Sequence, residues 1–86
     1  MNHDDEPDAV LARVRTLIRE LVPDLSQDAE IVHSNTFEAL GLTSLLVVDL
    51  VGSVEEDFHV AITDQQLVEL RRVGDLTGLL ADLRVA

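Results

Sequence analysis

The sequence predicts an all-α fold, a small bundle of three longer helices and one short helix. Apolar residues recur at helical spacing in three stretches, and a fourth, shorter stretch opens with a helix-capping pattern. No stretch alternates apolar and polar residues as a strand would. The 86 residues are 47% hydrophobic but only 2% aromatic, which predicts an aliphatic core. A chain of this length has room for one domain, expected over residues 1–86.

The first helix is expected over residues 7–22. Pro7 suits the first turn, where its missing N–H is not needed, and the neighbouring residues 4–6 are acidic, which favours the positive end of the helix dipole. Pro23 cannot continue the helix. The apolar stripe comprises Val10, Val14, Leu17, Ile18 and Leu21.

A long loop is expected over residues 23–43. This segment has no sustained helical period and is rich in Pro, Asp, Ser, Asn and Gly, which favour turns and caps. Loops of this length are unusual in small domains and often carry function. We expect four apolar side chains to hold it against the core: Ile31, Phe37, Leu40 and Leu42.

The central helix is expected over residues 44–58, with Thr43 as its N-cap. Successive residues turn by about 100° around a helix, so the residues that point to the core are Val47, Leu50, Val51, Val54 and Phe58. The outward stripe is Leu45, Asp49, Gly52 and Glu56, with Leu46 and Ser53 beside it and Glu55 at its margin. Leucines mixed with carboxylates on an exposed face indicate a docking surface. The alternative is an inert, solvated surface.

Two more helices complete the prediction. Thr63 and Gln66 fit a capping box, which opens a short helix over residues 63–70. A last helix is expected over residues 73–84. Its apolar stripe is Val73, Leu76, Leu79, Leu80 and Leu83.

Ser44 is the candidate functional residue. A helix N-terminus offers unpaired N–H groups and a positive dipole end, which favour an anion such as a phosphate. Most serines in this position are caps. Because Thr43 can serve as the cap, the Ser44 hydroxyl is free to carry a group.

The chain resembles the acyl carrier protein family in the segment Phe37-Glu38-Ala39-Leu40-Gly41-Leu42-Thr43-Ser44-Leu45, followed by Val48-Asp49-Leu50-Val51 and Glu55-Glu56-Asp57-Phe58. The resemblance implies that Ser44 receives 4′-phosphopantetheine from coenzyme A, in a step that a separate transferase catalyses with Mg²⁺. The thiol of this arm then holds acyl intermediates as thioesters. The resemblance therefore implies a non-catalytic carrier.

The same resemblance implies a partner-binding surface. Its residues are Thr43, Leu45, Leu46, Asp49, Gly52, Glu55 and Glu56. Acidic groups there are expected to meet basic patches on a phosphopantetheinyl transferase and on acyl-loading, chain-elongating or acyl-transferring enzymes.

Two departures from the family pattern bear on the pathway. The residue before the serine is usually Asp in this family, and here it is Thr43; Leu46 stands where many fatty-acid carriers have a polar residue. These differences favour a polyketide or mixed polyketide–peptide pathway over housekeeping fatty-acid synthesis. An aminoacyl or peptidyl carrier, or an unmodified adaptor with the carrier fold, remain alternatives.

Composition excludes other classes of protein. A net charge of −11 argues against nucleic-acid and anionic membrane partners. The chain has no cysteine and no apolar leader, so we expect a cytoplasmic protein, most simply a monomer. The Gly-x-Ser-x-Gly pattern of many hydrolases is absent, and His3, His33 and His59 form no recognisable catalytic set. No metal-binding motif is present.

Overall fold

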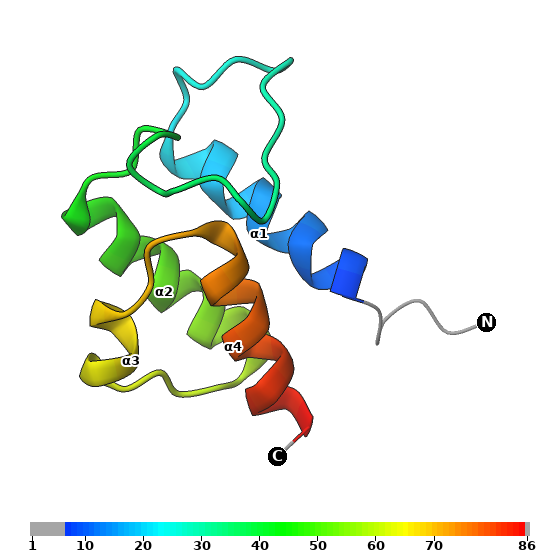
Figure 1. Ribbon diagram of the computed structural model, residues 1–86, viewed down its shortest axis with the longest axis vertical. Coiled ribbons are helices and arrows are strands. Elements are labelled where there is room, and N and C mark those ends of the chain that lie inside the picture. The colour runs from blue at the N-terminus through cyan, green and yellow to red at the C-terminus, as the bar shows by residue number, and fades with distance from the viewer. Residues whose placement is uncertain (1–6, 86) are drawn as a thin grey trace.

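The computed structural model describes residues 7–85, which form four helices and no strand (Figure 1). The helices are α1 (Pro7–Leu21), α2 (Ser44–Phe58), α3 (Asp64–Val68) and α4 (Val73–Val85). This architecture confirms the predicted all-α fold. His3 and the acidic residues 4–6 lie outside the described residues. No helix within residues 7–85 is long and apolar enough to cross a membrane.

The helix bounds differ from the predicted ones mainly at α3. Thr63 has extended backbone angles (φ −73°, ψ 160°) and is the N-cap, with the capping box to Gln66 complete. Glu69 caps the other end, so the helix covers five residues where eight were predicted. The predicted segment included its own caps, which lie outside the helix.

The core lies where α1 packs against both α2 and α4. Its most completely buried side chains are Val14, Ile18, Ile31, Leu50, Val54, Val73, Leu76 and Leu80. Two of the predicted core residues of α2, Val47 and Phe58, are only half-buried and pack against the edge of this cluster. The prediction that they belong to the core is wrong in degree, because they lie in the first and last turns of α2, whereas the buried residues of this helix lie in its middle.

The long loop is held by apolar anchors and by arginines of α1. All four predicted anchors are buried, which confirms that expectation. In addition, the Arg15 guanidinium donates to the carbonyl oxygen of Ile31 at 2.7 Å. The Arg19 guanidinium donates to the carbonyls of Ser26 (2.9 Å) and Ala29 (2.6 Å). The loop is therefore tied to α1 along its first half.

The second half of the loop is tied to the start of α4. The Phe37 N–H donates to the Arg71 carbonyl, and the Gly74 N–H donates to the His33 carbonyl, both at 2.9 Å. A Cβ at position 74 would lie 3.1 Å from that His33 oxygen, so glycine permits this close approach. These bonds fix the segment that leads into α2.

Candidate functional site

The turn before α2 sets the position of Ser44. Gly41 has φ +92°, a left-handed conformation that glycine adopts without strain. The next residue, Leu42, donates its N–H to the Phe37 carbonyl at 2.9 Å and buries its side chain. The chain therefore reverses over a buried anchor immediately before the helix begins.

Thr43 is the N-cap of α2, as predicted. Its backbone is extended (φ −72°, ψ 170°), and its hydroxyl accepts the Leu46 N–H at 3.3 Å. Ser44 is the first helical residue and is exposed to solvent. Capping is thus performed by Thr43, and the Ser44 hydroxyl is accessible at the positive end of the helix dipole.

Ser44 lies at the rim of an open hollow of about 710 Å³. The hollow lies between the turn before α2, the first turn of α2 and the connection from α3 to α4. Its apolar lining comes from Phe37, Leu42, Val47 and Leu70, and its polar rim includes Ser44 and Arg71. A group attached to Ser44 has a partly apolar surface beside it.

The outward stripe of α2 is exposed over most of its length. Leu45 is 71% exposed and Val48 is 49% exposed, which is unusual for large apolar side chains on one helix face. Asp49, Gly52 and Glu56 are exposed beside them. The space beside Gly52 is open, since an added Cβ would meet nothing within 4 Å. Val48 was not predicted in this stripe, although it follows Leu45 by three residues.

Two residues of the predicted partner-binding surface have other contacts. Leu46 is half-buried and packs against the hydrophobic core. Glu55 is half-buried, and its carboxylate accepts the Ile62 N–H at 2.9 Å, which holds the segment after α2. The exposed stripe therefore consists of Leu45, Val48, Asp49, Gly52 and Glu56.

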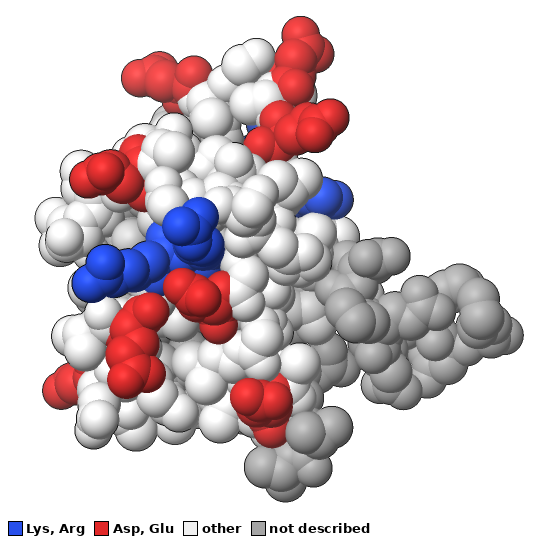
Figure 2. All heavy atoms as spheres, viewed as in Figure 1, with Lys and Arg blue, Asp and Glu red and all other residues white. Residues whose placement is uncertain are grey.

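The charge distribution near the site is uneven. Figure 2 shows basic side chains gathered over the connection from α3 to α4, with acidic side chains around them. Arg71 and Arg72 lie in this connection, and the backbone N–H of each donates to Asp75 Oδ2 at 3.0 Å. These two hydrogen bonds lower the pKa of the Asp75 carboxyl below its usual value. Arg71 was not predicted as a site residue, and no motif in the sequence points to it.

The histidines stand apart from Ser44. Neither His33 nor His59 lines the hollow beside Ser44. His59 is the C-cap of α2, in a left-handed conformation with φ 56°. Within the described residues, no three His, Asp or Glu side chains are grouped so that they could hold a metal ion.

Comparison with known proteins decides the family. The family described as "Phosphopantetheine attachment site" matches residues 12–80, most of the chain. The anthracycline acyl carrier protein DauA of Streptomyces sp. strain C5 is 39% identical over 66 residues, which cover 71% of this chain and 74% of that protein. The chain belongs to the acyl carrier protein family.

Further similarities extend along the whole carrier. The acyl carrier protein of Campylobacter fetus is 33% identical over 76 residues, 88% of this chain and 97% of that one. The crystal structure of an acyl carrier protein from Thermotoga maritima superposes with a TM-score of 0.82 at 25% identity, covering 99% of this chain and 96% of that one. The resemblance predicted from the sequence is therefore confirmed.

The carrier takes covalently attached phosphopantetheine, as its family does. The described residues fit such a group, since they offer an exposed hydroxyl beside an open, partly apolar hollow. The chain has no cysteine, so the thiol needed for thioester chemistry must come from the attached group.

Proposed function

We propose that Ser44 is the attachment point for phosphopantetheine in this carrier. The observation that carries the proposal is the division of roles at the start of α2, where Thr43 caps the helix and the Ser44 hydroxyl is left exposed. None of the other described serines begins a helix. Ser53 is half-buried in the middle of α2, and Ser34 lies in the long loop. Ser26 also lies in this loop, and its hydroxyl accepts the Asp28 N–H.

In the attachment step, the Ser44 hydroxyl oxygen forms a bond to the phosphorus that bears the pantetheine of coenzyme A. The bond from that phosphorus to the adenosine-side phosphate breaks, and the hydroxyl proton goes to a base of the transferase. The positive end of the α2 dipole favours the resulting phosphodiester anion. When bound, the group supplies the thiol that carries the acyl cargo.

We further propose that the exposed stripe of α2 binds the partner enzymes. These are a phosphopantetheinyl transferase and the enzymes that load, extend or transfer the acyl group. Asp49 and Glu56 attract basic patches, while Leu45 supplies apolar contact area. Catalytic groups come from the partners, and this chain contributes the attachment point and the docking surface.

The pathway proposed for this carrier is of the polyketide type. The anthracycline acyl carrier proteins of two Streptomyces strains, each 39% identical, support this proposal. Thr43 and Leu46, which depart from the pattern of many fatty-acid carriers, also favour it. An aminoacyl cargo on protein isolated from its native host would instead favour a peptidyl carrier.

The attachment is tested by incubating the protein with coenzyme A, Mg²⁺ and a promiscuous phosphopantetheinyl transferase, followed by intact-mass measurement. We expect a phosphopantetheine increment in the wild type and in Ser53→Ala, a serine of the same helix, but none in Ser44→Ala. An increment in Ser44→Ala places the attachment elsewhere. No increment in any form favours an unmodified adaptor.

A further inference from the structure

The arginines whose side chains the structure describes divide by what their guanidinium groups bind. Arg13 pairs with Asp57, Arg15 and Arg19 hold the long loop, and Arg72 donates to the Ser34 carbonyl at 2.8 Å. Arg71 differs from these. Its guanidinium makes no hydrogen bond or ion pair within the described part of the chain. This is notable because the protein is acidic and offers many carboxylates with which an arginine could pair.

The backbone of Arg71 is nevertheless fixed on both sides. Its N–H donates to Asp75 Oδ2 at 3.0 Å, and its carbonyl accepts the Phe37 N–H at 2.9 Å. The residue therefore has a defined position between α4 and the turn before α2. From that position the residue lines the hollow at whose rim Ser44 lies.

Among the residues that line this hollow, Arg71 is the one cation and Glu38 the one carboxylate. A phosphodiester at Ser44 adds a negative charge beside Glu38, on a chain whose net charge is already −11. A guanidinium from a residue that lines the same hollow can compensate that charge, because its planar set of donors matches phosphate oxygens.

We propose that Arg71 is a positioning residue that binds the phosphodiester joining the phosphopantetheine arm to Ser44. This inference rests on Ser44 being the attachment point. The Arg71 guanidinium donates to a non-bridging phosphate oxygen and holds the root of the arm over the hollow. An arm attached there would have the apolar lining of Leu42, Val47 and Leu70 beside it.

The first test compares the unmodified and the phosphopantetheinylated wild type by NMR of the arginine Nε–Hε groups. Intact mass establishes loading beforehand, so a wild type that does not load refutes the attachment proposal and this inference together. In the loaded protein we expect the Arg71 signal to shift and its exchange with water to slow, while the Arg72 signal stays in place. Equal shifts at both arginines, or none at Arg71, would overturn the inference alone.

The second test uses Arg71→Gln with Arg72→Gln as its matched control, since both remove one positive charge from adjacent residues. In loaded Arg71→Gln, the phosphorus-31 resonance should move toward that of the same serine phosphodiester in urea-unfolded loaded protein, while Arg72→Gln should keep the wild-type position. The melting temperature gained on loading should fall by roughly 2–5 °C in Arg71→Gln relative to the wild type, and this difference should shrink in 1 M salt. An unchanged phosphorus resonance in Arg71→Gln would contradict the proposal.

Discussion

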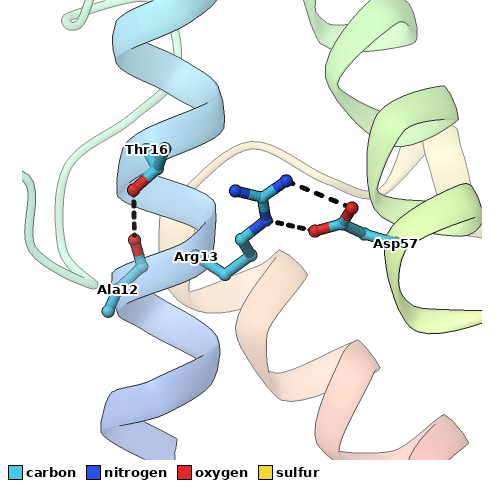
Figure 3. Close-up of polar contacts among 4 residues, drawn as sticks. All are labelled: Ala12, Arg13, Thr16 and Asp57. Atoms are coloured by element: carbon cyan, nitrogen blue, oxygen red, sulfur yellow. Dashed lines mark hydrogen bonds and ion pairs between the residues drawn. The ribbon is translucent and has the colours of Figure 1, made fainter.

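Arg13 on α1 and Asp57 in the last turn of α2 form a two-contact ion pair that joins the two helices at the surface (Figure 3). The Arg13 Nε donates to Asp57 Oδ2, and Nη2 donates to Oδ1 at 3.1 Å. The hydrogen bond from Arg13 lowers the pKa of the Asp57 carboxyl, and the positive charges of Arg13 and His59 lower it further. Both side chains are partly exposed, so solvent screens the pair.

Replacing Arg13 with Gln should raise the pKa of Asp57 back toward its usual value. A depressed carboxyl pKa stabilises the fold above the unfolded-state pKa, near 3.8, and this stabilisation is lost as the pH falls through the lower folded-state pKa. Wild type and Arg13→Gln should therefore differ slightly in melting temperature at pH 7 and converge in acid or in high salt. Carbon-13 titration of the Asp57 carboxyl measures the shift. An unchanged Asp57 titration would show that the pair does not form.

Truncating α2 side chains should reveal the difference in burial along the helix. Leu50 is fully buried, whereas Val47 is half-buried at the edge of the hollow. We expect Leu50→Ala to lower the free energy of unfolding by about 2–5 kcal/mol and Val47→Ala by only about 1 kcal/mol. Urea unfolding followed by circular dichroism gives both values. An equal decrease in the free energy of unfolding in both variants would mean that Val47 belongs to the core.

The features that the sequence predicted well depend on local or periodic signals. The caps at Thr43 and Thr63 need only a few neighbouring residues, and the loop anchors are isolated apolar residues in a polar segment. The helical period also gave the buried face in the middle of α2 and most of its exposed stripe. It did not show that burial decreases toward the ends of the helix, which is why Val47 and Phe58 were expected deeper in the core than they are.

The contacts that the sequence did not predict join distant segments. Arg15 and Arg19 of α1 bind carbonyls of the loop that lie 7 to 16 residues away in the sequence. Arg71 reaches the hollow beside Ser44 only because residues 33–37 lie against residues 71–74. Such contacts depend on the path of the loop across the bundle, and no residue spacing in the sequence predicts that path.

Replacing Asp75 with Asn should weaken the start of α4. The carboxylate accepts two backbone N–H groups, from Arg71 and Arg72, and these bonds depress its pKa. The substitution should lower the free energy of unfolding by about 1 kcal/mol at pH 7, since the site is exposed and solvent screens charge-assisted hydrogen bonds there. Because the carboxyl pKa is lower in the folded state than the usual 3.8, the difference from wild type should shrink as the pH falls below about 4 and be lost only below the folded-state pKa. A pH series of thermal melts checks this, with Asp82→Asn as the control; a difference that does not shrink below pH 4 would contradict it.

Two glycine-to-alanine substitutions should act in opposite directions. Gly41 has φ +92°, so Gly41→Ala forces a side chain into a strained conformation and should cost about 1–2 kcal/mol. Gly52 lies within α2 with open space around it, so Gly52→Ala should stabilise the protein by about 1 kcal/mol, or about 4–8 °C in melting temperature. Differential scanning calorimetry of both variants measures these shifts. A destabilising Gly52→Ala would show that the space there is not free.

Reversing charge on the exposed stripe of α2 should slow transfer to partner enzymes. Asp49 and Glu56 are exposed on this stripe, and neither forms an ion pair within the described residues. Asp49→Arg or Glu56→Arg repels a basic patch that the wild type attracts, which lowers the association rate, by about tenfold at low salt and less at high salt. Phosphopantetheinylation rates at limiting protein concentration measure the effect, while far-ultraviolet circular dichroism confirms that helicity is unchanged.

The matched control for this stripe is Asp82→Arg, which makes the same charge change at an exposed position on α4. If docking uses α2, Asp82→Arg should keep transfer within about twofold of the wild type, because rim charges away from an interface act only through the net charge. A similar decrease in the transfer rate in Asp49→Arg, Glu56→Arg and Asp82→Arg would mean that the net charge of the protein, rather than the α2 stripe, steers its encounter with the partner. A loss confined to Asp82→Arg would place the docking surface on α4, away from the helix that begins at Ser44.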